Sequence, residues 1–169
     1  METADILDAA RVGFASLKVS PSTQELALSH LGIWLEDPRF VMYHAQIVAM
    51  VERQRWHTLI DCFYRVLPFG TGGRRGRVGI GPNSFNPWTL STSIQGHAMW
   101  LRQSRGEGGL SVVIGYDVRQ FSDIGRALES GIHSPVDGIT SRNFAEIAAE
   151  IYAAQDITVY LPPEGAVLS

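Results

Sequence analysis

The chain has 169 residues, a formal net charge of -3 and a hydrophobic content of 45%. This mildly acidic composition excludes the broad basic surface that general nucleic-acid binding requires. A single cysteine, Cys62, excludes an intrachain disulfide. No stretch reaches the ~20 apolar residues of a membrane span, and residues 1–5 lack the apolar core of a signal peptide. We therefore expect a cytoplasmic protein with neither nucleic-acid nor membrane partners.

Residues 1–66 are predicted to form a helical N-terminal extension. Ser22 is predicted to cap one helix, and Asp37 followed by Pro38 to begin another, with Asp37 at the N-cap. Apolar residues then recur at the spacing of one helical face, at Val41, Ala45, Val48 and Val51. Cys62 is interpreted as a small buried side chain, because nothing beside it in the sequence suggests an activated thiolate.

A glycine- and arginine-rich segment follows, in which residues 69–77 read F-G-T-G-G-R-R-G-R. It is too rich in glycine for a helix interior, so we predict a loop with positive φ angles. Successive backbone N–H groups in such a turn can bind an anion. Thr71 adds a hydroxyl donor, and Arg75 offers the planar fork that suits a phosphate. The alternative is a solvated turn with surface arginines.

The next elements are predicted from short apolar runs. Residues 78–83 are predicted to form a short strand, and Asn86 followed by Pro87 predicts a helix start. One face of that helix carries Leu90, Ile94, Ala98 and Leu101. Residues 110–116 are predicted to form a strand buried on both faces. Asp117 and Arg119 lie just beyond its carboxyl end.

The last third of the chain completes a strand–helix–strand unit. Residues 121–139 hold three glycines and one proline without a period, so we expect a long loop or insertion. Ser141 is predicted to cap a helix whose buried face holds Phe144, Ile147, Ala148 and Ile151. Residues 157–161 form a second predicted strand, parallel to the first with a right-handed crossover. Ligands of such sheets bind at the carboxyl ends of the strands.

Six segments in fixed order resemble the α-D-phosphohexomutases, the phosphoglucomutase/phosphomannomutase family. Residues 69–76 resemble its opening F-G-T-A/S-G-L/I-R-G, and residues 112–119 match V-V-I-G-Y-D-x-R. The other matches are the paired asparagines Asn83 and Asn86 with Thr89, the Q-G of Gln95 and Gly96, the F-A of Phe144 and Ala145, and the strand at 157–161. The resemblance covers residues 67–163 and leaves residues 1–66 outside the core pattern.

The resemblance implies a fold and a reaction. The fold class is α/β, with a mixed or parallel sheet layered between helices as in the family's three-layer domain I. Residues 67–169 would form that domain, incomplete at its C-terminal end. The family interconverts hexose 1-phosphate and hexose 6-phosphate of glucose or mannose through a phosphoserine, with Mg²⁺ and glucose 1,6-bisphosphate as activator. Its partners here would be the hexose phosphate substrate and the remaining mutase domains.

The resemblance also assigns roles to residues of this chain. Arg75 and Thr71 would act at the catalytic phosphate, with Arg75 beside the phosphoserine. Gly70, Gly72 and Gly73 would shape the phosphate-binding wall with them. Asp117 and Arg119 are further candidates for phosphate or substrate contact, and the alternative for this pair is a structural ion pair.

Several departures from the family pattern bear on these expectations. Arg74 replaces an aliphatic residue and should point outward or reshape the loop, and residues 123–139 are longer than the usual link. The T-A-S-H-N-P serine motif, the D-G-D-G-D-R metal loop and the sugar-selecting G-E-E-S-G-G loop do not occur in the sequence. No metal ligand is therefore predicted in this chain, glucose and mannose are not distinguished, and the chain alone is expected to be inactive.

Two other function classes stay open at this stage. The chain could be a non-catalytic module that binds a phosphate or sugar phosphate through the glycine-rich loop. It could instead be a helical protein-interaction module, in which case the Val41–Val51 face should be an exposed apolar stripe.

Overall fold

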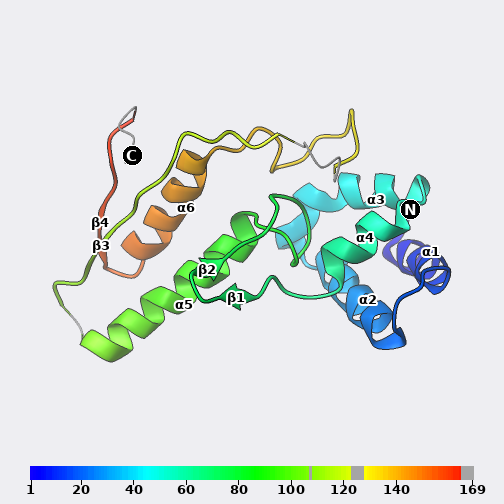
Figure 1. The fold of residues 1–169 in the computed structure, drawn as a ribbon, viewed down its shortest axis with the longest axis horizontal. Helices are drawn as coiled ribbons and strands as arrows, with labels where there is room; N and C mark the ends of the chain where they lie inside the picture. The colour runs from blue at the N-terminus through cyan, green and yellow to red at the C-terminus, as the bar shows by residue number, and fades with distance from the viewer. Residues whose placement is uncertain (107, 123–127, 165–169) are drawn as a thin grey trace. The chain divides into compact units, whose positions relative to one another are not determined.

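The computed structural model describes residues 1–106, 108–122 and 128–164. They form two compact units, one of residues 1–86 with 128–137 and one of residues 87–106 and 108–122 with 138–164. Figure 1 colours the elements from the N-terminus in blue to the C-terminus in red. Each unit is considered by itself below.

The described residues of the first unit form four α-helices and one 3₁₀-helix, followed by a small hairpin. The helices are α1 (Thr3–Ala15), α2 (Pro21–Glu36), η1 (Pro38–Tyr43), α3 (His44–Glu52) and α4 (Trp56–Phe63). The hairpin pairs β1 (Phe69–Gly70) with β2 (Gly73–Arg74) in antiparallel register. The prediction of a helical segment before residue 67 is thus confirmed.

Capping residues explain where these helices begin. The Ser20 hydroxyl accepts a hydrogen bond from the Thr23 amide at 3.2 Å, so Ser20 caps α2 and the prediction of Ser22 was wrong by two residues. Asp37 accepts a bond from the Arg39 amide at 2.9 Å, as predicted. The turn that it caps is 3₁₀ rather than α, and the α-helix begins only at His44.

Aromatic rings form the centre of the first unit. Trp34 stacks on Phe40 with ring centroids 4.3 Å apart and meets the edge of Phe63 at 5.6 Å. Tyr43 packs beside Trp34 at 4.8 Å, and burial raises the pKa of its hydroxyl to about 12. This cluster brings α2, η1 and α4 together and gives the helical segment a core of its own.

The buried face of α3 differs from the predicted stripe. Gln46, Ile47 and Met50 are fully buried, whereas Val41 is 62% exposed. Because the 3₁₀ turn changes the residue spacing before His44, the residues around it do not continue the phase of the helix that follows. Of the predicted stripe, Val41 and Ala45 are exposed and Val48 is half-buried, whereas Val51 is buried, so the exposed apolar face does not reach the end of α3.

The second unit contains the predicted strand–helix–strand unit. It comprises α5 (Pro87–Arg105), β3 (Ser111–Val113), α6 (Ser141–Ala153) and β4 (Thr158–Tyr160). β3 pairs with β4 in parallel, with Val112 opposite Val159, which confirms the predicted parallel pairing. Figure 1 shows α6 leading into β4.

The two strands are buried on one face only. Val112 and Val159 pack on a cluster formed by Ala98, Tyr152 and Ile157, whereas Val113 and Tyr160 are 76% and 60% exposed. The prediction of strands buried on both faces was therefore wrong. A short apolar run is compatible with a strand buried on one face or on both faces. Here α5 and α6 pack against only one face of the two strands.

The sequence prediction of the remaining elements was mixed. Residues 78–83 form no strand and make only an isolated bridge between Val78 and Phe85. Thr140, not Ser141, caps α6, and with Asn143 it forms a reciprocal capping box. The described part of residues 121–139 contains neither helix nor strand, as predicted, and residues 123–127 lie outside the described residues. The coarse class is mixed α/β, mostly helical with two small sheets.

Candidate functional site

The glycine-rich segment forms a tight hairpin rather than an open loop. Gly70 pairs with Gly73, so only Thr71 and Gly72 form the turn between the strands. Gly73 adopts a φ of 101°, which fulfils the prediction of a positive φ that favours glycine. A hollow of about 410 Å³ is lined by residues 68–73 and by Arg75.

Three arginines near the hairpin have different surroundings. The guanidinium of Arg74 lies 5.0 Å from the centre of the Phe69 ring, and burial lowers the pKa of Arg74. Arg74 is half-buried, so it does not simply point outward. Arg77 forms an ion pair with Asp61 of α4 at 2.6 Å.

Of the three arginines near the hairpin, Arg75 is the most available to a ligand. Its side chain is exposed and, among the residues that the structure describes, it has neither a hydrogen bond nor an ion pair. Its Nη2 atom stands 3.2 Å from the position that a Cβ on Gly72 would occupy. The guanidinium is therefore folded back over the turn, where it borders the same hollow as Thr71.

The hairpin thus brings together five of the predicted site residues. Gly70, Thr71, Gly72, Gly73 and Arg75 all line the hollow. The Thr71 hydroxyl is exposed and has no partner in the described part of the chain. A flexible cation beside a turn of small residues can accept an oxyanion without first breaking an existing ion pair.

Asp117 and Arg119 belong to the second unit and are considered separately. The Arg119 Nε donates to Asp117 at 2.6 Å, and the Ser141 hydroxyl at the start of α6 also donates to Asp117. The Ser141 hydrogen bond, with those from Arg119, lowers the pKa of the Asp117 carboxyl. This arrangement joins the end of β3 to the first turn of α6, as a structural ion pair would.

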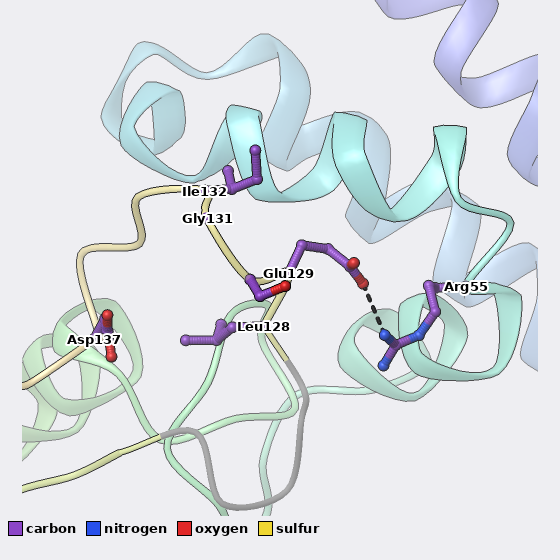
Figure 2. Close-up of a pocket in the computed structure, with 7 residues that line it drawn as sticks. Arg55, Leu128, Glu129, Gly131, Ile132 and Asp137 are labelled. Atoms are coloured by element: carbon purple, nitrogen blue, oxygen red, sulfur yellow. Dashed lines mark ion pairs between the residues drawn. The ribbon is translucent and has the colours of Figure 1, made fainter.

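A buried acidic residue in the first unit was missed by the sequence analysis. Glu129 is 4% exposed, and its Oε2 accepts from Arg53 at 2.7 Å. Arg55 Nη1 lies 3.1 Å from Oε1, close enough for an ion pair although the direction of its N–H does not make a hydrogen bond. Figure 2 shows the Glu129 carboxylate turned toward Arg55, with Asp137 elsewhere on the pocket wall.

Backbone contacts fix Glu129 in this place. The buried Gln46 side chain accepts from the Glu129 amide at 2.7 Å and donates to the Ile132 carbonyl at 2.6 Å. These bonds attach the described part of the insertion to α3, beside a hollow of about 480 Å³. No sequence signal marks this partnership, because Gln46 and Glu129 are 83 residues apart.

Other candidate residues have structural surroundings. Cys62 is buried, and burial raises the pKa of its thiol to about 11, in agreement with the interpretation of an unreactive cysteine. Trp34 is buried, whereas Trp100 is 55% exposed. Within the described ranges, no three histidine, cysteine, aspartate or glutamate side chains gather closely enough to hold a metal ion. No helix in those ranges is both long and apolar enough to cross a bilayer.

A family model matches residues 67–134, and it describes phosphoglucomutase/phosphomannomutase, alpha/beta/alpha domain I. This match confirms the family resemblance. The matched segment begins two residues before β1 and includes the five predicted site residues that line the hollow. Asp117 and Arg119 fall within the same matched segment.

Curated relatives carry phosphomutase names. The phosphoglucomutase of Staphylococcus aureus is 32% identical over 102 residues, which is 60% of this chain and 15% of the relative. The phosphopentomutase of Mus musculus is 28% identical over 129 residues, 76% of this chain and 18% of the relative. The phosphoglucomutase of Staphylococcus haemolyticus is 32% identical over 99 residues, which is 59% of this chain and 14% of the relative.

The chain therefore spans less than a fifth of the length of these curated relatives. No solved structure matches it.

Proposed function

We propose that residues 67–169 contribute the first α/β domain of a sugar-phosphate mutase and that the β1–β2 hairpin contacts a phosphoryl group. The observation that carries the proposal is the exposed Arg75 beside the hollow, unpaired within the described ranges, in a segment that matches domain I of the phosphoglucomutases and phosphomannomutases. In a complete domain the β3–β4 sheet would lie between helical layers. Residues 1–66 would be the helical extension before it.

In the proposed reaction, the hairpin stabilises charge rather than transferring a proton. Phosphoryl transfer depends mostly on positioning and electrostatic stabilisation. Arg75 would hold phosphoryl oxygens with its two-pronged guanidinium, while Thr71 donates a hydroxyl hydrogen bond. Gly70, Gly72 and Gly73 would let the backbone approach the same group. Asp117 and Arg119 would support a neighbouring wall or contact substrate directly.

The remaining parts of the reaction are proposed for the longer protein. A serine in the T-A-S-H-N-P segment, which follows this stretch in the family pattern, would carry the phosphoryl group, and Mg²⁺ held by later domains would offset its charge. Glucose 1,6-bisphosphate would serve as activator, in a cytoplasmic enzyme of carbohydrate metabolism. Since the sequence of 169 residues holds no T-A-S-H-N-P motif, the chain by itself is expected not to turn over substrate.

The substrate is proposed to be a hexose phosphate of glucose or mannose, and a pentose phosphate is a second candidate. The Staphylococcus relatives are named phosphoglucomutase. The mouse relative, named phosphopentomutase, matches a longer part of the chain, 129 residues against 102. A hairpin that binds phosphate would serve either sugar, because it addresses the group that both share.

The proposal is tested by titrating the isotope-labelled 169-residue chain with glucose 1,6-bisphosphate, glucose 1-phosphate, ribose 5-phosphate and inorganic phosphate. We expect the amide resonances of Gly70, Gly72 and Gly73 to shift with all phosphates. Arg75→Gln should weaken binding about tenfold, whereas Arg105→Gln, at the exposed end of α5, should leave it unchanged. The absence of hairpin shifts with every phosphate would contradict the proposal.

A mutase assay separates the catalytic proposal from a binding module. Glucose 1-phosphate conversion is measured for the 169-residue chain and for the product of any longer reading frame, with Mg²⁺ and the bisphosphate present. Activity in the longer product alone supports the mutase. Phosphate binding without activity in either product supports the non-catalytic module instead.

A further inference from the structure

The segment that follows the hairpin is attached to the C-terminal end of α4, and Asn83 makes two of the hydrogen bonds in this attachment. The amide group of Asn83 donates from Nδ2 to the Asp61 carbonyl at 2.7 Å. Its backbone N–H donates to the Cys62 carbonyl at 3.1 Å. Asn83 thus satisfies two carbonyls that a helix end leaves without partners.

The other terminal carbonyls of α4 are also satisfied. The Ile60 carbonyl accepts from the Tyr64 amide at 2.8 Å, and the Phe63 carbonyl is bonded to Nδ1 of His30 at 2.7 Å. Because a carbonyl only accepts, His30 must carry its proton on Nδ1. The end of α4 therefore depends on a residue from α2 and on Asn83 from beyond the hairpin.

Further contacts hold Asn83 and the hairpin ends in place. Arg65 Nε donates to the Asn83 Oδ1 at 2.8 Å, so the side-chain amide is engaged at both ends. The Leu67 amide donates to the Pro82 carbonyl at 2.8 Å, which closes the loop at its base. Asp61 also pairs with Arg77, two residues after Arg75.

Close backbone packing makes this attachment rigid. Gly81 has a φ of 81°, and a Cβ there would stand 2.4 Å from the Cys62 carbonyl oxygen. The buried Asn86 amide donates to the Gly79 and Gly81 carbonyls at 3.0 and 2.9 Å. Backbone contacts thus fix residues 77–86 against α4. At Gly81 these contacts leave no room for a side chain.

We propose that Asn83 is a positioning residue for the phosphate-binding hairpin, acting through the end of α4 in the N-terminal helical segment. The phosphate-binding role of the hairpin in this inference rests on the proposed function, whereas the attachment of the loop to α4 does not. It gives residues 1–66 a structural role, because their last helix supplies the surface on which the loop from residue 67 to residue 86 is held. Arg75 then projects from a loop with two fixed ends.

Two substitutions separate this role from simple packing. Asn83→Ala removes the donor and the acceptor. Asn83→Asp keeps the shape and the acceptor for Arg65 but places a carboxylate oxygen against the Asp61 carbonyl. A packing role predicts that the nearly isosteric Asp is the milder change. The positioning role predicts that Asp is at least as disruptive as Ala.

The matched control is Asn143→Ala. Asn143 also completes a helix cap, donating from its backbone to Thr140 and accepting from it at the start of α6. Its loss should weaken a helix end by a similar amount, but in the other compact unit.

The experiment measures hydrogen exchange and inorganic phosphate titration on the 169-residue chain. We expect both Asn83 variants to speed exchange of the Leu67 and Phe85 amides about tenfold, and to weaken phosphate binding severalfold, with no such change in Asn143→Ala. Unchanged exchange at these amides, or a harmless Asn83→Asp, would overturn the inference. If wild type binds no phosphate, the proposed function fails while the exchange results still decide the attachment.

Discussion

Gly81→Ala tests how closely the loop approaches α4. The added methyl group would stand 2.4 Å from the Cys62 oxygen, whereas carbon–oxygen contacts normally exceed about 3.3 Å. The backbone would have to move by about 1 Å. That movement puts at risk the Asn83 N–H bond to Cys62 and the Asn86 bond to Gly81, each contributing about 1 kcal/mol. The left-handed φ of 81° adds about 1 kcal/mol for alanine.

We therefore expect Gly81→Ala to lower the free energy of unfolding of the first unit by about 3 kcal/mol. With an ordinary urea dependence, the unfolding midpoint falls by about 1.5 M. Urea unfolding is followed by tryptophan fluorescence, for which Trp34 in the aromatic cluster is a reporter of this unit, and by circular dichroism.

Gly131→Ala is the matched control for backbone strain. Gly131 belongs to the same unit and has a similar φ of 76°, but a Cβ there would have no atom within 4 Å. Gly131→Ala should lower the free energy of unfolding by about 1 kcal/mol, because it introduces the backbone strain without the steric clash. If Gly81→Ala destabilises the chain no more than Gly131→Ala, the close approach of the loop to α4 is not rigid and the reasoning fails.

Three other predictions concern charged and titrating groups. Glu129→Gln should lower the free energy of unfolding by about 1–3 kcal/mol, because it removes the ion pairs with Arg53 and Arg55. Both guanidiniums are half-exposed, which weakens these pairs. Glu36→Gln, at an exposed side chain, should change the free energy of unfolding little in the same urea titration. Burial raises the native pKa of Cys62 to about 11, so the unfolded thiol ionises first and stability should fall as the pH rises from 9 to 11. Cys62→Ala should remove that part of the slope, and an unchanged slope would refute the assignment. The pKa of Asp117 is lowered mainly by Ser141, so its contribution is present above pH 4 and is lost as the pH falls. Asp117→Asn should flatten the acid side of the thermal unfolding profile, and an unaltered profile would contradict the role given to this pair.

Local sequence signals predicted much of the element order. Proline after an N-cap residue predicted that helices begin at Pro38 and Pro87. The β-branched runs before and after a helical segment predicted the parallel pairing of β3 with β4. The same signals were less accurate about detail. Ser20 and Thr140 act as caps in place of the neighbouring serines that were predicted, because several residues with hydroxyls can fill one role.

Tertiary relations were less visible in the sequence. The glycine-rich segment and Arg75 could be named as a candidate site because their residue types are suited to phosphate. Gln46 and Glu129 are separated by 83 positions in the sequence, and Asn83 and Asp61 by 22 positions. Helix or strand periodicity does not indicate contacts between residues so far apart. The division predicted at residues 66 and 67 rests on the extent of the family resemblance and stays a prediction. The roles of Thr71, Arg75, Asp117 and Arg119 also stay predictions.

The shared end of α4 has a practical consequence for anyone who dissects this chain. A cut between Val66 and Leu67 would follow the start of the family match but would divide one compact unit. The released piece would present Ile80 and Leu67, both nearly inaccessible in the structure, to water. The helical piece would keep its aromatic centre yet lose the partners of the Asp61 and Cys62 carbonyls. Expression of the two halves as separate polypeptides should therefore recover soluble material only when they are produced together.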